Sequence, residues 1–103
     1  MIEVFKDDEN LFRFQLKTDD GNSIFKSVSF ETKDEAERMV SVLKPLILQA
    51  SGFERKTNYQ GKFLFNLKGA TGQLIGNSPL YDSEAGMENG IKNLKTKIDT
   101  LNI

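Results

Sequence analysis

The sequence predicts an α+β protein built from two tandem β-β-β-α repeats that share one antiparallel sheet, with both helices on one face and a pseudo-two-fold relation between the repeats. Two observations support this fold class. The chain of 103 residues aligns with itself without a gap at an offset of 51 positions. Each copy shows strand-like alternation followed by helix-like periodicity. We therefore expect one domain, residues 1–103, made of repeat 1 at about 2–47 and repeat 2 at about 53–98.

The self-alignment is clearest in the second predicted strand of each repeat. There Phe12-Arg13-Phe14-Gln15-Leu16-Lys17 aligns with Phe63-Leu64-Phe65-Asn66-Leu67-Lys68. Identical residues also align at Gly21 and Gly72, Ile24 and Ile75, Ser27 and Ser78, Glu37 and Glu88, and Leu43 and Leu94. Because these matches share one register and one hydrophobic pattern, both copies should fold alike.

Three strands are expected in each repeat. The first spans residues 2–6 and 53–57, and the charged second version suits an edge strand. The second spans 12–17 and 63–68, where every other residue is apolar and faces a core. The third runs near 23–27 and 74–78, after turns that contain glycine. Sequential strands with short turns form an antiparallel meander.

An amphipathic helix follows the strands in each repeat. Thr32-Lys33-Asp34-Glu35 forms a capping box, and Ser83 retains the capping hydroxyl in repeat 2. The apolar helix faces are Ala36, Met39, Val40, Leu43 and Ile47, and then Met87, Ile91, Leu94 and Ile98. Pro45 is expected to limit or distort the first helix. Gly90 costs its helix ~1 kcal/mol relative to alanine, so we expect close approach of helix and sheet there, with a larger residue filling the space. The tails, 46–50 and 100–103, could each add a terminal strand.

The composition excludes several chemistries. Cysteine and histidine are both absent, which rules out disulfides, thiolate catalysis, a Ser-His-Asp triad and Cys- or His-based metal sites. We expect no cofactor and no metal. The first residues carry no signal-peptide pattern, and no apolar run approaches the ~20 residues that span a bilayer. The sequence therefore predicts a cytoplasmic protein without a membrane partner.

Charge gives little indication of a partner. The net charge is −1, with residues 1–51 net acidic and residues 52–103 net basic. This difference either arises by chance or favours docking of the two halves and weak self-association. The absence of a strongly basic surface argues against nucleic-acid binding. A monomer is plausible, because the second copy can take the place of a dimer partner.

Repeat 2 resembles the YegP-like family of small bacterial proteins. The resemblance is carried by the strand 63–68, then Gly72-Gln73-Leu74-Ile75-Gly76-Asn77-Ser78, Tyr81-Asp82-Ser83 and Glu88-Asn89-Gly90-Ile91. It covers nearly the whole chain, strongly in 53–95 and weakly in 2–44. Repeat 1 departs from the pattern, with Glu37-Arg38-Met39-Val40 at the helix centre and Phe25 in place of the glycine after Ile24. The resemblance implies two three-strand-plus-helix units that share a sheet, in a family of unknown function, and it implies no activity.

Three polar segments need a structural interpretation beside a functional one. Glu88-Asn89-Gly90 could bind a ligand, but a structural role is favoured, in which Gly90 allows close packing and the polar pair bonds a neighbouring backbone group. The glycine-rich segment 69–76 is expected to join two strands as a hairpin, because no helix follows it as a phosphate loop requires. The acidic turns at 7–9 and 19–20 lack the ligand spacing of a calcium loop and are expected to be solvated.

The remaining candidates lie on the sheet face opposite the helices. Alternation places Arg13, Gln15 and Lys17 there, with Asn66 and Lys68 from repeat 2, and Phe5 and Phe25 are expected beside them. Such a face, or a sheet edge, could serve a non-enzymatic binding or interaction module. The alternatives are a carboxylate-based enzyme centred on the second-repeat helix and a weak single-stranded nucleic-acid binder. The candidate ligand-binding residues are Arg13, Lys17, Asn66, Lys68, Glu88 and Asn89, and no catalytic residue is assigned.

Overall fold

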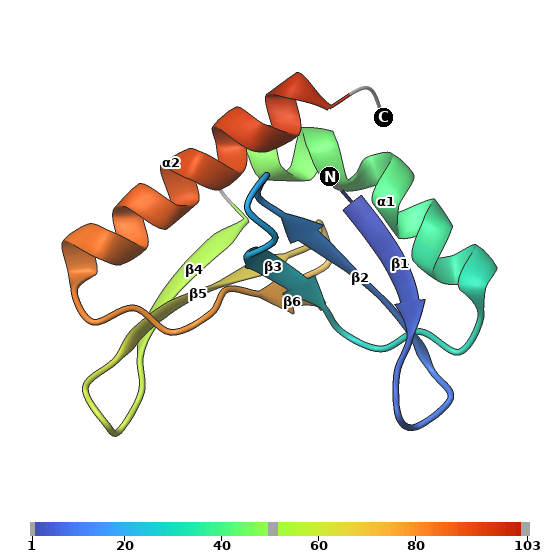
Figure 1. Ribbon diagram of the computed structural model, residues 1–103, viewed down its shortest axis with the longest axis horizontal. Helices are drawn as coiled ribbons and strands as arrows, with labels where there is room; N and C mark the ends of the chain where they lie inside the picture. The colour runs from blue at the N-terminus through green and yellow to red at the C-terminus, as the bar shows by residue number, and fades with distance from the viewer. Residues whose placement is uncertain (1, 50–51, 102–103) are drawn as a thin grey trace.

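The computed structural model describes residues 2–49 and 52–101, which fold into one six-stranded sheet and two helices. In chain order the elements are β1 (Ile2–Lys6), β2 (Phe12–Lys17), β3 (Ser23–Ser27), α1 (Lys33–Leu48), β4 (Phe53–Thr57), β5 (Phe63–Lys68), β6 (Leu74–Asn77) and α2 (Glu84–Thr100). Both helices cover the same face of the sheet (Figure 1). The predicted α+β class and the β-β-β-α order are confirmed.

The sheet joins two meanders through their third strands. Its order is β1-β2-β3-β6-β5-β4, and every neighbouring pair is antiparallel. Where β3 meets β6, Lys26 pairs with Asn77, which stands 51 positions later in the chain. Equivalent residues of the two halves therefore face each other at this contact, as a two-fold relation between the halves requires. The polar strand β4 lies at an edge, as expected. Its charged side chains there discourage pairing with another chain.

The connections repeat as closely as the strands. A register shift follows Leu16 in β2, and another follows Leu67 at the equivalent place in β5. The β2–β3 and β5–β6 turns place Gly21 at φ 89° and Gly72 at φ 85°, a conformation that a Cβ disfavours. Gly69 N donates to Gln73 O at 2.8 Å, so the glycine-rich segment is a hairpin, as expected.

The N-caps of both helices are as predicted from the sequence, but the C-terminal ends are not. Thr32 Oγ1 accepts from Glu35 N at 3.1 Å, and Ser83 Oγ accepts from Gly86 N at 3.0 Å. Helix α1 continues through Pro45 to Leu48, because a proline so near the end leaves one carbonyl unbonded while Gln49 N still bonds Pro45 O. The tails predicted as possible strands are therefore helical at 46–48 and at Thr100. Gln49 and Leu101 are the C-cap residues of the two helices and belong to no strand. The rest of that prediction, at residues 50 and 102–103, lies outside the described residues.

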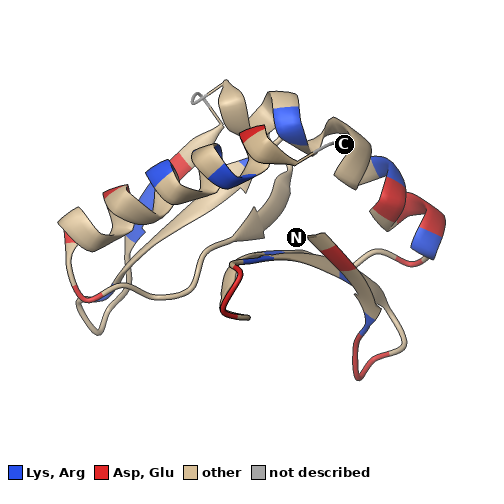
Figure 2. Cartoon of the chain, turned by 45° about the horizontal axis from the view of Figure 1, so that its top comes forward, with Lys and Arg blue, Asp and Glu red and all other residues tan. Residues whose placement is uncertain are grey.

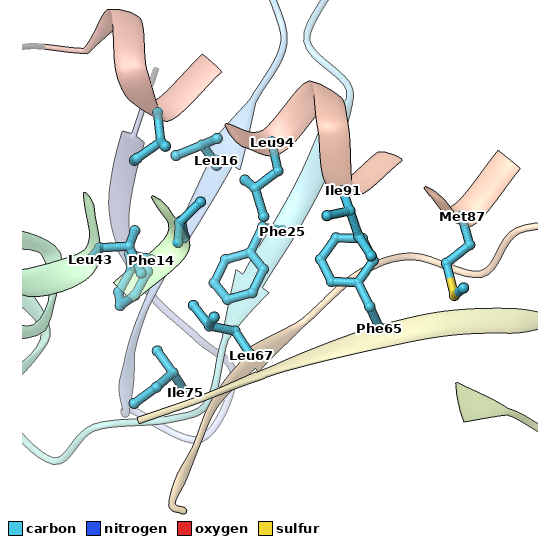
Figure 3. Packing of buried hydrophobic residues seen from close by; sticks show 12 residues of the cluster. Phe14, Leu16, Phe25, Leu43, Phe65, Leu67, Ile75, Met87, Ile91 and Leu94 are labelled. Carbon is cyan, nitrogen blue, oxygen red and sulfur yellow. The ribbon is translucent and has the colours of Figure 1, made fainter. Parts of the chain in front are cut away.

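The core fills the space between the sheet and both helices (Figure 3). Its fully buried members include Phe14, Leu16, Phe25, Leu43 and Ile47 from repeat 1 and Phe65, Leu67, Ile75, Leu94 and Ile98 from repeat 2. Phe25 was expected on the opposite face, and that expectation is wrong. The register shift after Leu16 breaks the strict alternation, so Phe25 pairs with Leu16 on the helix side. A Cβ at Gly76 would meet the backbone carbonyl oxygen of Lys26 and would lie 2.6 Å from Phe25 Cζ, so only glycine fits there.

Candidate binding face

The side of the sheet without helices, here called the open face, carries a polar row across every strand. Successive registered pairs link Glu3, Gln15, Lys26, Asn77, Asn66 and Glu54 in that order from β1 to β4. All six side chains point away from the core because their strand neighbours, such as Phe14, Leu16 and Phe65, point into it. The row runs through the contact between β3 and β6, so the two repeats contribute equally to it.

At each end of the row a glutamate is held by an amide and a lysine, and in repeat 2 Lys56 Nζ also lies 3.6 Å from Glu54 Oε1. In repeat 1, Gln15 Nε2 donates to Glu3 Oε1 at 2.9 Å and Lys17 Nζ lies 3.7 Å from Glu3 Oε2. In repeat 2, Asn66 Nδ2 donates to Glu54 Oε1 at 3.2 Å and Lys68 Nζ lies 3.2 Å from Glu54 Oε2. The Asn66 amide and then Lys68 lower the pKa of Glu54. Three of the predicted residues therefore already bind a glutamate of this chain: Lys17 binds Glu3, and Asn66 and Lys68 bind Glu54.

On the open face, a second cross-strand pair joins an apolar residue to a cation, and the strand that carries the cation differs between the repeats. Phe5 pairs with Arg13 in repeat 1, and Lys56 pairs with Leu64 at the equivalent positions of repeat 2. An apolar residue and a cation therefore stand side by side near each edge. Phe5 lies on this face, as expected, and is partly buried.

The fourth predicted residue, Arg13, is fixed by the β1–β2 turn. Its Nε donates to Asp7 Oδ2 and to Ser29 Oγ, both at 3.1 Å. Asp7 Oδ1 in turn accepts from the backbone N–H groups of Glu9 and Leu11. Burial alone would raise the pKa of Asp7, but these hydrogen bonds outweigh it and the pKa is lowered. The carboxylate of Asp7 thus organises the turn, and the described residues contain no cluster of acidic side chains suited to a metal ion.

The open face is basic although the chain is not. Its strands carry the basic side chains Arg13, Lys17, Lys26, Lys56 and Lys68 and the acidic side chains Glu3 and Glu54, and Asp7 of the β1–β2 turn pairs with Arg13, which leaves a basic surplus. The whole chain carries a net charge of −1, so the acidic surplus lies elsewhere. Figure 2 shows acidic residues in the turns, whereas both helices carry acidic and basic residues. Each helix carries three basic and three acidic residues, so the acidic surplus lies in the turns and connecting segments.

Two of the predicted residues lie away from the open face. Glu88 and Asn89 are exposed on α2, on the helix side of the sheet. Arg55 of β4 binds Glu88 through both carboxylate oxygens, with Arg55 Nη2 at 3.1 Å from Oε1. The hydrogen bond from Arg55 lowers the pKa of Glu88. The expectation that this pair bonds a backbone group is not what the structure shows, because Glu88 bonds a side chain.

Gly90 has the structural role that the sequence suggested. A Cβ at this position would lie 2.6 Å from Tyr81 Cζ, so the absence of a side chain makes room for the tyrosine ring. Tyr81 stacks on Phe65 with ring centroids 6.5 Å apart, and burial raises the pKa of its hydroxyl. The residue that fills the space left by the helix glycine is therefore Tyr81.

Several residues of the open face could not be found from the sequence. Lys26 and Asn77 were missed because the register shifts obscure the alternation in β3 and β6. Glu3 and Glu54 were missed as functional partners because their clusters depend on cross-strand register. A sequence signal did exist for the carboxylates, since a glutamate occupies the second position of the first strand in both repeats.

The fold and this face define a class, namely small α+β proteins in which a doubled β-β-β-α unit leaves one polar sheet face uncovered. The family described as a domain of unknown function, DUF1508, matches residues 58–103. UPF0339 protein YegP of Escherichia coli (strain K12) is 38% identical over 94 residues, which cover 91% of this chain and 86% of that protein. The UPF0339 protein in the ptx operon 5′ region of Stutzerimonas stutzeri is 34% identical over 94 residues, covering 91% and 85% of the two chains. This chain belongs to the UPF0339, YegP-like family.

Solved structures of two relatives agree with this assignment. The solution NMR structure of yegP from E. coli, described as a protein of unknown function, superimposes with a TM-score of 0.89 at 35% identity, covering 98% of this chain and 87% of that one. The NMR structure of a UPF0339 protein from Shewanella oneidensis gives a TM-score of 0.89 at 29% identity, covering 99% and 86%. Neither helix in the described part of this chain is long and apolar enough to cross a membrane.

Proposed function

We propose that this protein is a non-enzymatic binding module whose open face holds an acidic polypeptide segment. The observation that carries the proposal is the surplus of basic side chains on that face in a chain of net charge −1. An acidic partner would be attracted to this face and repelled by the acidic turns. We further propose that residues 1–103 act as one domain of repeats 2–47 and 53–98, in the cytoplasm.

The chemistry of the polar row favours a polypeptide over nucleic acid. Gln15, Asn66 and Asn77 carry amides, which donate and accept hydrogen bonds as a peptide backbone does. Binding of single strands relies on exposed aromatic rings that stack with bases. Phe25 is buried, and Phe5, the aromatic residue that the register places on this face, is partly buried beside Arg13.

The carboxylate-enzyme alternative gains no support from the surroundings of Glu88. A catalytic acid needs a raised pKa, whereas Arg55 lowers the pKa of Glu88. A hollow between β4 and α2 is lined by Arg55, Lys56, Thr57, Phe63, Glu84 and Met87 and not by Glu88.

The test is a titration of the nitrogen-15-labelled protein with a synthetic glutamate-rich peptide and with its glutamine-rich analogue. We expect amide shifts in β2, β3, β5 and β6 with the acidic peptide alone, and we expect them to weaken with salt. A quadruple variant with alanine at Arg13, Lys17, Asn66 and Lys68 should lose most of this response. The matched control carries alanine at Lys33, Arg38, Lys92 and Asn93, which are exposed on the helices.

Three outcomes would overturn the proposal. Equal binding by the quadruple variant and the control variant would show that the open face is not involved. Tighter binding of a short oligothymidylate than of the acidic peptide would favour nucleic acid. Shifts that depend on protein concentration without peptide would identify the open face as an interface between copies of the chain.

A further inference from the structure

One part of the open face is hollowed at the junction of the two repeats. The hollow measures about 180 Å³ and is lined by Ser23, Lys26, Asn77, Ser78 and Pro79. It lies where β3 begins beside the segment that leaves β6. In liquid water each molecule takes up about 30 Å³, so the hollow has room for several waters or for a small charged group on a short side chain.

The polar groups around the hollow are donors whose bonding capacity is unused. Within the described residues, the Ser23 hydroxyl is buried and has no hydrogen-bond partner. Lys26 is exposed, and neither Lys26 nor Asn77 makes a side-chain hydrogen bond or ion pair to another described residue. Ser78 differs, because its hydroxyl accepts from Phe65 N at 2.9 Å and donates to Pro79 O at 2.8 Å. Ser78 therefore builds the wall, and the other three polar residues remain available.

We propose that this hollow binds a carboxylate group, supplied by an Asp or Glu side chain of the acidic segment. The inference rests on the proposed function and locates its anchoring point. Lys26 supplies the charge and Asn77 Nδ2 a neutral donor. The Ser23 hydroxyl can turn toward the ligand about χ1, since it has no bond to break. The glutamates of the open face do not compete, because Glu3 and Glu54 are held in their own clusters.

The hollow is a feature of one side of the repeat junction. The position equivalent to Ser23 in repeat 2 is Leu74, which is partly exposed and carries no donor. The three donors therefore converge once, although the strands around them are repeated. A single anchoring point makes the two directions in which a segment could lie along the face inequivalent.

The experiment uses acetate and acetamide as probes at matched ionic strength. Both have the same shape, but only acetate carries the charge. In the nitrogen-15-labelled protein we expect millimolar acetate to shift the amides of Ser23, Lys26, Asn77 and Ser78, and acetamide to leave them unchanged. Lys26→Gln should weaken the response to acetate about ten-fold. Lys92→Gln, which makes the same charge change at an exposed site on α2, should not.

Ser23→Ala provides a second, opposite readout. It should weaken acetate binding, and it should also raise the melting temperature of the free protein by a few degrees, because it removes a buried hydroxyl without a partner. Unchanged acetate binding in both Lys26→Gln and Ser23→Ala would overturn the inference. Tighter binding of inorganic phosphate than of acetate would overturn the carboxylate assignment.

Failure of this inference can be told apart from failure of the proposed function. If the glutamate-rich peptide shifts the open face but neither peptide nor acetate shifts the four hollow amides, the hollow is not the anchor and the binding face remains. If acetate shifts these amides and the peptide does not bind, the carboxylate site remains and the proposed function is wrong.

Discussion

The two repeats carry different side chains at equivalent core positions. Where one repeat has a large side chain, the other has a glycine. At the repeat junction, Phe25 of repeat 1 lies over Gly76, its own equivalent in repeat 2. At the helices, repeat 1 combines Phe30 with Met39, whereas repeat 2 combines Tyr81 with Gly90. The comparison teaches that two units with the same backbone register can pack differently when side-chain volume is placed on opposite sides of the axis between them.

The grooves beside the helices show the same divergence in polarity. One groove, between α1 and the β5–β6 turn, measures about 300 Å³ and is lined mainly by Met39, Val42, Pro45, Leu46 and Ala70. Its counterpart beside α2 measures about 440 Å³ and is lined by polar residues that include Asn93, Thr96 and Lys97. Across this second groove, Lys97 Nζ forms an ion pair with Asp19 Oδ1 at 2.9 Å. Equivalent backbones thus present one apolar and one polar surface.

The largest effect is expected from removing the ring at the junction. Phe25→Ala should lower the free energy of unfolding by about 3–5 kcal/mol, because a fully buried ring leaves a cavity that the glycine opposite cannot fill. Chemical denaturation measures this loss. Phe5→Ala is the matched control on the open face and should cost much less, since Phe5 is only partly buried. Similar losses for both variants would contradict the central role of the junction.

A smaller effect is expected from giving repeat 2 the helix residue of repeat 1. Gly90→Met should cost about 2 kcal/mol, because the added side chain displaces Tyr81 and overpacking costs about 1–3 kcal/mol. Adding Tyr81→Phe should recover part of the loss, since the hydroxyl is the group nearest the new Cβ. Asn89→Met, at an exposed position of the same helix, is the control for the gain in helix propensity. A Gly90→Met variant as stable as the wild type would show that Tyr81 moves at no cost.

Replacing the proline of α1 should stabilise the protein. Pro45→Thr introduces the residue that α2 carries at the equivalent position and restores a backbone donor for the carbonyl of Ser41. We expect a gain of about 1 kcal/mol, less than the ~3 kcal/mol penalty of a proline at a helix centre, because Pro45 lies in the last turns. Thermal unfolding measures the gain. A loss of stability would mean that the proline ring contributes packing in the apolar groove that outweighs the missing bond.

The sequence was sufficient for the fold because the relevant signals are local. Alternation from Phe12 to Lys17, the capping hydroxyls of Thr32 and Ser83 and the turn glycines each reflect interactions within a few residues. Phe25 was placed on the wrong face and Lys26 was missed, because the register shift in the β2–β3 pair depends on how the two strands pair. The carboxylate clusters and the hollow were also beyond the sequence, since both depend on pairing between strands distant in the chain.

The smallest predicted effect concerns an ion pair that only repeat 2 makes. Arg55 lowers the pKa of Glu88 in the folded protein, so the pair stabilises the fold above the ordinary pKa of a glutamate, about 4.3. This stability is lost as the pH falls from there through the lower folded-state pKa. Glu88→Gln should therefore be slightly less stable than the wild type at neutral pH and equal to it in acid. The effect is small because both partners are exposed to solvent.

The equivalent residues of repeat 1 provide the control for this comparison. Glu37 and Val4 occupy the positions of Glu88 and Arg55, and no ion pair forms between a carboxylate and an aliphatic side chain. Urea denaturation of Glu88→Gln and Glu37→Gln across the acidic range would separate the two repeats. A shallower acid dependence in Glu88→Gln alone would place the electrostatic difference at β4 and α2. The same dependence in both variants would mean that Arg55 does not distinguish the repeats, and that their divergence lies in packing.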